Sequence, residues 1–112
     1  MPTFITQGRY TQDAVKGMLA KPEDRSESVA QFFAKAGGKM IAYYMTFGEY
    51  DFLIVSEGPS LDVAAAAAIV AAAGGGVTDL KTTVGMTSSE MKNAFIKAGG
   101  IAAGFRSAGA NG

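Results

Sequence analysis

Residues 46–59 read TFGEYDFLIVSEGP, and this stretch decides the fold. Its centre, FLIV at residues 52–55, is a short apolar run of residues that favour strands, and Gly58-Pro59 ends the run. Gly48 lies before the run, and we expect it to adopt a positive φ, which a side chain would resist, at the pivot of a tight turn. The stretch therefore predicts a turn that leads into a strand over residues 51–57.

Three further stretches of the chain have the composition or alternation of strands. Residues 39–47 are rich in Met, Ile and Tyr, and Gly48-Glu49-Tyr50 is short enough to join them to residues 51–57 as an antiparallel hairpin. Residues 3–10 predict the first strand of the chain and residues 77–86 the last. The sequence therefore predicts four strands, two of them adjacent along the chain.

The stretch between the first two strands carries the period of a helix. Thr11 is a good N-cap, and an i, i+3, i+4, i+7 pattern of apolar residues follows, made by Val29, Phe32, Phe33 and Ala36. Pro22 interrupts the pattern, and we interpret it as the first position of a second helical segment. We therefore expect one bent helix, or two abutting ones, over residues 11–36, with Gly37-Gly38 as the C-cap pair.

Two more helices are predicted further along the chain. Ser60 is expected to cap an alanine-rich helix that Gly74-Gly75-Gly76 ends. Thr87-x-x-Glu90 has the spacing of a capping box and predicts the start of a last helix, which we expect Gly99-Gly100 to end. We therefore divide the chain into a folded domain, residues 1–98, and a Gly/Ala-rich tail, residues 99–112.

The predicted elements follow the order β-α-β-β-α-β plus a terminal helix, which is typical of a ferredoxin-like α+β fold. Right-handed crossovers would place both main helices on one face of a four-stranded antiparallel sheet. The strands carry apolar residues on both sides; in the first, Phe4 and Tyr10 are expected on one face and Ile5 and Arg9 on the other. One helical layer covers one face only. The second face therefore needs a partner, and a second copy of the chain is the simplest one.

Composition excludes several classes of function. The 112 residues fit one domain, and ten basic residues cancel ten acidic ones, so nothing indicates a nucleic-acid partner. The chain has no cysteine and no histidine, which removes disulfides, thiolate chemistry and the commonest ligands of metals and haem. We therefore expect no cofactor and no metal site. No signal-peptide pattern and no apolar run of membrane-spanning length is present, so we expect a soluble cytoplasmic protein that does not enter the membrane.

The GEYD stretch, with apolar strands on both sides, resembles the GYD family of small bacterial α+β proteins. Arg9-Tyr10-Thr11, the Gly-Gly pair before the second strand and Thr87-x-x-Glu90 support the resemblance. It implies a dimeric α/β barrel, in which the sheets of two copies close against each other as a homodimer or a higher homo-oligomer. That superfamily includes cofactor-free monooxygenases, isomerases, haem proteins and ligand-sensing domains. The absence of histidine argues against the haem branch.

The candidate binding residues lie around the GEYD turn and on the first two strands. Asp51 is either a pocket carboxylate with Tyr50 as its hydrogen-bonding partner, or a turn cap that accepts backbone N–H groups. Arg9 and Tyr10 end the first strand, and Arg9 either binds a substrate carboxylate or forms an ion pair with Asp51 or Glu49. The adjacent Tyr43 and Tyr44 are two further candidates. One of them should face the helices and the other the opposite face of the sheet.

Two hypotheses about function remain open. The first is a non-catalytic module that binds a small molecule or oligomerises. The alternative is a cofactor-independent enzyme, similar to a monooxygenase or an isomerase, that acts on a small, largely apolar substrate between sheet and helices. A pocket lined together by Arg9, a tyrosine and Asp51 would favour the enzyme. Pairing of those side chains with one another would favour the module.

Overall fold

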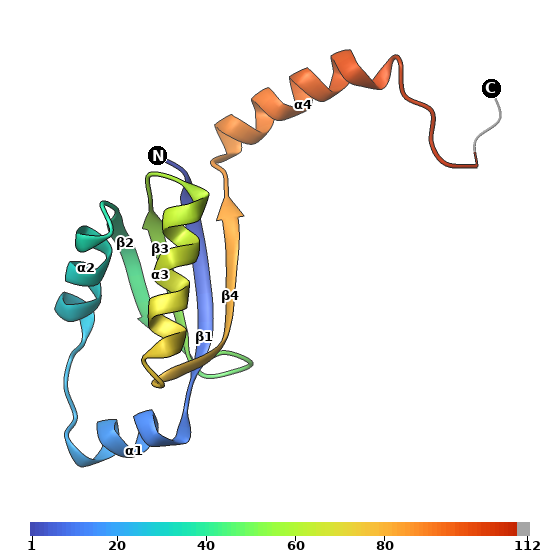
Figure 1. The fold of residues 1–112 in the computed structure, drawn as a ribbon. Helices are drawn as coiled ribbons and strands as arrows, with labels where there is room; N and C mark the ends of the chain where they lie inside the picture. The colour runs from blue at the N-terminus through green and yellow to red at the C-terminus, as the bar shows by residue number, and fades with distance from the viewer. Residues whose placement is uncertain (110–112) are drawn as a thin grey trace.

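The computed structural model describes residues 1–109 as a ferredoxin-like α+β fold built on a four-stranded antiparallel sheet (Figure 1). The elements follow one another as β1 (Thr3–Tyr10), α1 (Gln12–Ala20), α2 (Ser26–Lys35), β2 (Lys39–Met45), β3 (Phe52–Glu57), α3 (Leu61–Ala73), β4 (Val77–Gly85) and α4 (Ser88–Ala102). The strand order is β2-β3-β1-β4, and each neighbouring pair is antiparallel. The predicted fold class is confirmed.

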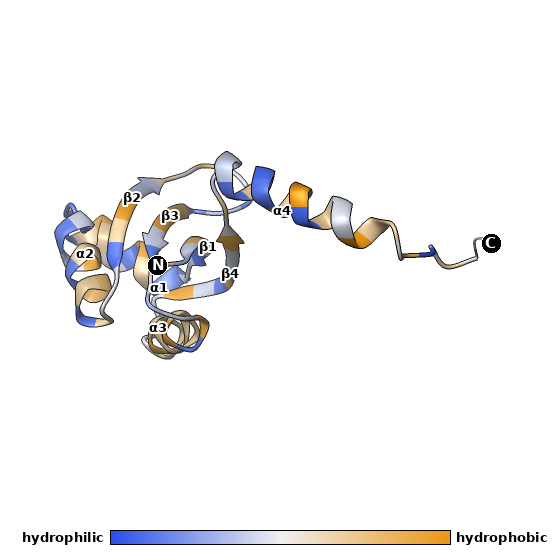
Figure 2. Ribbon diagram, turned by 90° about the horizontal axis from the view of Figure 1, so that it is seen from above, coloured by the Kyte–Doolittle hydropathy of each residue, from blue (hydrophilic) through white to orange (hydrophobic). Residues whose placement is uncertain are grey.

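The sheet has one covered face and one open face in the described chain. Figure 2 shows α2 and α3 on the same side of the curved sheet. Every second residue of β3 is buried toward that side: Phe52, Ile54 and Ser56 are 4%, 8% and 3% exposed. Phe4 of β1 pairs with Ser56 and is 3% exposed, so the core is concentrated on the two central strands.

The end of α2 and the start of α4 follow the local rules that their sequences predict. Gly37 has a φ of +80° and donates its N–H to Ala34 O at 3.0 Å, while Gly38 donates to Phe33 O at 2.9 Å. These two bonds form a Schellman motif, which satisfies the last carbonyl groups of α2. At α4, Glu90 N–H donates to Thr87 Oγ1 and Thr87 N–H donates to Glu90 Oε1, so the capping box is confirmed.

Residues 11–36 form two helices and not one bent helix, and the two do not abut as expected, because residues 21–25 separate them. Pro22 is not the first residue of the second helix, because α2 begins at Ser26. The Asp24 carboxylate accepts the N–H of Ser26 at 2.9 Å. Asp24 therefore satisfies a donor at the start of α2, and Pro22 lies in the connection between the two helices.

The prediction of a positive φ at Gly48 is wrong. Among residues 1–109, positive φ values occur at Gly37, Gly75, Gly109 and Asp79. The β2–β3 connection spans residues 46–51, and two hydrogen bonds from Thr46 close it. The N–H of Thr46 donates to Asp51 O at 2.9 Å, and its hydroxyl donates to Tyr50 O at 2.7 Å. A loop of this length spreads the chain reversal over several residues, so no single position needs a left-handed conformation.

The prediction that Gly99-Gly100 ends the last helix is also wrong. α4 continues through both glycines to Ala102, and neither glycine has a positive φ. Glycine permits the left-handed cap but does not impose it. α4 projects away from the sheet (Figure 1), and its Phe95 and Ile101 are both 72% exposed. Of the expected tail, residues 110–112 lie outside the described residues. Within residues 1–109, none of the helices combines the length and the apolar character needed to cross a membrane.

We propose that the segment after α4 contributes little to stability. Phe105 is the one large apolar side chain of this segment, and it is 72% exposed. Removing the segment therefore loses almost no buried apolar area. Deletion of residues 103–112 is expected to leave the melting temperature within about 2 °C of the wild type in differential scanning calorimetry. A loss of many degrees would show instead that the segment packs against the protein.

Candidate functional site

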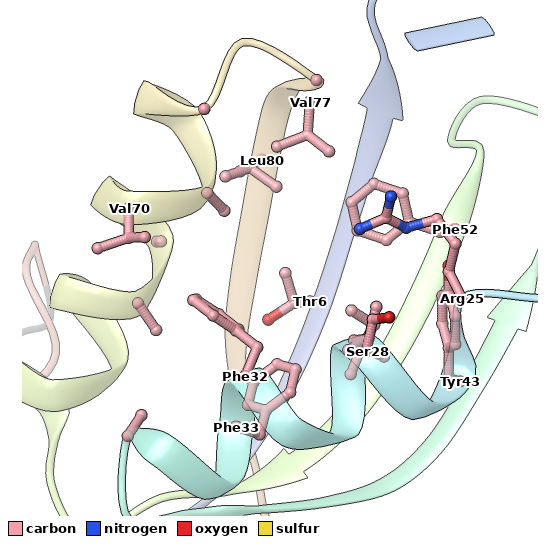
Figure 3. A pocket seen from close by; sticks show the side chains of 18 of the residues that line it. Thr6, Arg25, Ser28, Phe32, Phe33, Tyr43, Phe52, Val70, Val77 and Leu80 are labelled. Atoms are coloured by element: carbon pink, nitrogen blue, oxygen red, sulfur yellow. The ribbon is translucent and has the colours of Figure 1, made fainter. Parts of the chain in front are cut away.

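A cavity of about 730 Å³ lies between the sheet and the helices α2 and α3 (Figure 3). Phe52, Thr6 and Leu80 belong to its floor on the sheet, and Phe32 and Phe33 of α2 line one wall. The volume falls within the range of about 300–1,000 Å³ that small-molecule sites occupy. The site is therefore large enough for a ligand of several carbon atoms and is mostly apolar.

The alanine content of α3 explains why the space between sheet and helices is not filled. The α3 residues that line the cavity include four alanines at helical spacing, Ala64, Ala67, Ala68 and Ala71. A methyl group reaches less far from the helix than a leucine or phenylalanine side chain would, so the floor and this wall do not meet. The sequence analysis described this helix only as alanine-rich. The i, i+3, i+4, i+7 spacing of these alanines is the signal that indicates a cavity wall.

Two tyrosines form the polar end of the cavity. The hydroxyl groups of Tyr10 and Tyr43 are 3.1 Å apart, and each also lies near the sulfur of Met45, at 3.3 and 3.5 Å. Burial raises the pKa of Tyr10, and the hydrogen bond from Tyr43 raises it further. Tyr10 therefore keeps its proton at neutral pH and can donate a hydrogen bond.

Arg25 stands at the same end of the cavity. It precedes α2 at the N-cap position, and its guanidinium lies 3.6 Å from the Glu23 carboxylate, with both side chains about half exposed. The charge of Arg25 acts on Tyr10 against the effect of burial and lowers the pKa of its hydroxyl. Arg25 and the two tyrosines line the same cavity, and Figure 3 shows Arg25 beside Tyr43 and Phe52. The sequence analysis did not select Arg25, because the residue gains its place only from the path of the α1–α2 connection.

Arg9, Tyr50 and Asp51 lie outside the cavity, around the β2–β3 turn. Arg9 Nε donates to Glu49 O at 2.7 Å, its NH1 lies 3.6 Å from Asp79, and its guanidinium carbon is 5.5 Å from the centre of the Tyr50 ring. The carboxylate partner of Arg9 is therefore Asp79, and not Asp51 or Glu49. The irregularity in the β1–β4 pairing after Gln7 includes Asp79, whose φ is 52°.

Asp51 joins the turn to β1. Its carboxylate accepts the N–H of Tyr10 at 2.9 Å, and its own N–H donates to Gly8 O at 2.8 Å. These bonds are those of the turn cap that the sequence analysis gave as one of two roles for this residue. Tyr50 lines a separate hollow of about 250 Å³ together with Gln7 and Lys81. The predicted residues are therefore not gathered in one place: Tyr10 and Tyr43 line the cavity, and the other four do not.

Tyr44 lies on the open face of the sheet, opposite the cavity. It pairs with Leu53 of β3, whose neighbours Phe52 and Ile54 face the helices, and it is 63% exposed. Tyr43 faces the helices and contacts Tyr10. Within residues 1–109, carboxylates do not gather in groups of three or more that could hold a metal ion.

The fold and the cavity define a ferredoxin-like α+β protein with a small-molecule-sized site between sheet and helices. A family model, the GYD domain, matches residues 4–95, and the chain belongs to that family. The comparison with curated proteins gives no match. Among solved structures, the chain is similar to the crystal structure of FFRP-DM1 at 16% identity, with a TM-score of 0.47 over 77% of this chain and 100% of that chain.

Proposed function

We propose that this GYD-domain protein is a non-catalytic module that binds a small, largely apolar molecule and associates with itself. The observation that carries the binding role is the cavity of about 730 Å³, with aromatic and alanine walls and a pair of hydroxyl groups at one end. Apolar walls with a few convergent polar groups are typical of small-molecule sites.

The enzymatic alternative has less support, because the groups predicted for catalysis do not meet in the cavity. Asp51 is committed to the backbone of β1, and Arg9 to Glu49 O, Asp79 and the Tyr50 ring. Tyr10 does line the cavity, but its raised pKa disfavours the phenolate that would act as a base. The contacts of these three residues hold the turn and the first strand together, which is a structural role.

Filling the cavity tests the binding role. Ala67→Phe places a ring in the cavity, whereas Ala66→Phe adds the same ring on the exposed side of α3. We expect Ala67→Phe to weaken binding of the neutral fluorescent probe N-phenyl-1-naphthylamine by about tenfold or more, and Ala66→Phe to change it by less than about twofold. Fluorescence titration measures the affinity, and far-ultraviolet circular dichroism checks that both variants fold. Equal affinity of the two variants would contradict the proposed site.

The proposal of self-association rests on the open face of the sheet. The ladder places Ile5 beside Val55, and Leu53 beside Tyr44, on the face that no helix of the described chain covers. A two-fold contact between two such faces would bury the same patch on both copies. A homodimer is therefore the simplest assembly that removes these side chains from water.

A further inference from the structure

We infer that the ligand of the cavity is an amphipathic monocarboxylate, whose carboxylate is bound by Arg25, Tyr10 and Tyr43 and whose apolar body lies between α2, α3 and the sheet. The inference rests on the proposed binding function and specifies the chemical class of its ligand. Carboxylate recognition needs a cation and hydrogen-bond donors that converge on one point, and this end of the cavity supplies both.

The guanidinium of Arg25 is available to a ligand. Its contact with Glu23 is long, at 3.6 Å, and within residues 1–109 its side chain forms no hydrogen bond. Both side chains are about half exposed, so Glu23 can turn into water when another carboxylate takes its place. A guanidinium binds a carboxylate through two parallel N–H bonds, which the present ion pair does not use.

Within residues 1–109, one hydrogen of the tyrosine pair has a thioether as its protein acceptor. Two neutral hydroxyls carry two hydrogens, and the bond between Tyr10 and Tyr43 uses one of them. The acceptor within reach of the other, among the described residues, is Met45 Sδ, which lies 3.3 Å from Tyr10 Oη and 3.5 Å from Tyr43 Oη. A thioether is a weak acceptor, and a carboxylate oxygen is a much stronger one. A ligand carboxylate would therefore improve this hydrogen bond as well as pair with Arg25.

The charges along the cavity orient the ligand and limit its charge. Lys21, Glu23 and Arg25 line the tyrosine end, and Asp24 brings the formal charge of the same connection to zero. The Asp24 carboxylate accepts the N–H of Ser26 at the start of α2, so the charged residues of this connection that line the cavity are Lys21, Glu23 and Arg25. Beyond that end, the cavity lining within residues 1–109 includes no further lysine or arginine. A second carboxylate on the ligand would lie among mostly apolar side chains without a cation, which is costly. A single carboxylate at the Arg25 end is therefore favoured, and a dicarboxylate is disfavoured.

The rest of the cavity accommodates an apolar body. Phe32 and Phe33 stand edge to face with ring centres 5.6 Å apart, and Val70 and Leu80 lie among the lining residues labelled in Figure 3. Each methylene group that enters such surroundings increases affinity by about fourfold. An alkyl chain attached to the carboxylate would therefore bind more tightly with each added carbon until the cavity is full.

Ligands that differ only in the head group test this inference. Decanoate, 1-decanol and decylamine, each below its aggregation concentration, are titrated at pH 7 against protein loaded with N-phenyl-1-naphthylamine. We expect decanoate to displace the probe at a concentration about tenfold or more below that of 1-decanol, and decylamine to be the weakest. Arg25→Gln should remove the preference for decanoate over 1-decanol and leave the affinity for 1-decanol within about twofold.

The control is Arg106→Gln, which removes a cation from the exposed segment after α4 and should leave all three affinities unchanged. Equal binding of decanoate and 1-decanol by the wild type would overturn the carboxylate assignment and leave the proposed binding function intact. A preference for decanoate that survives in Arg25→Gln would overturn the role of Arg25. Failure of all three ligands to displace the probe, with no effect of Ala67→Phe, would refute the binding function itself.

Discussion

Replacing Gly38 by alanine is expected to lower the free energy of unfolding by about 2–4 kcal/mol, a large share of the stability of a domain of this size. A Cβ atom at Gly38 would overlap the carbonyl oxygen of Glu57 and would lie 3.5 Å from Gly58 Cα. Both obstacles are backbone atoms. Glu57 is held in the ladder by its pairs with Lys39 and Thr3, so neither strand can move aside without losing hydrogen bonds.

Gly48→Ala is the matched control for Gly38→Ala. A Cβ atom at Gly48 would meet nothing within 4 Å, and Gly48 does not have a positive φ. We expect its unfolding free energy to stay within about 0.5 kcal/mol of the wild type. Urea unfolding followed by circular dichroism compares the two variants at one protein concentration. Similar stability of Gly38→Ala and Gly48→Ala would show that β2 can shift away from Glu57.

The contrast between these two glycines illustrates what the sequence could predict. Gly37-Gly38 was predicted to end a helix, and the local rule is enough, because the Schellman bonds join residues within one turn. The conformation of Gly48 depends on the length of the loop and on the bonds of Thr46 to Tyr50 and Asp51, which short-range patterns do not determine. Short-range patterns also do not determine where α4 ends. Gly99-Gly100 permits a helix cap but does not impose one, and α4 continues through both glycines.

The candidate site was predicted less completely than the fold. Alternation correctly placed Phe4 and Tyr10 on one face of β1, because the period of a strand is a local property. It could not decide between Tyr43 and Tyr44, since the β2–β3 register shifts between Met40 and Ala42. Alternation also could not predict the contact between Asp79 and Arg9. That contact depends on the pairing of β1 with β4 and on the irregular register beside Gln7.

The open face of the sheet leads to the second large expected effect, which concerns assembly. Tyr44 of β2 is 63% exposed, and Leu53, Val55 and Ile5 lie across the same face. A stable homodimer contact buries about 2,000 Å² in total. At about 25 cal/mol per Å², such a contact outweighs the entropy lost on association. We therefore expect the wild type to be a dimer at micromolar concentration.

Tyr44→Lys should dissociate this dimer without unfolding the chain. A lysine at a position that is 63% exposed in the single chain keeps its charge in water, so the fold tolerates it. In a sheet-to-sheet contact, the same lysine would be buried on both copies without a partner, which costs several kcal/mol per ion. Ile69→Lys is the control, because Ile69 is 67% exposed on α3, on the opposite side of the sheet.

Light scattering after size exclusion measures the outcome. The wild type and Ile69→Lys should have the mass of two chains of 11.5 kDa, and Tyr44→Lys the mass of one. The melting temperature of the wild type should rise with protein concentration, because unfolding is coupled to dissociation, and that of Tyr44→Lys should not. A wild-type mass of one chain at micromolar concentration would refute the dimer. A dimer that persists in Tyr44→Lys but is lost in Ile69→Lys would place the contact on the helical side instead.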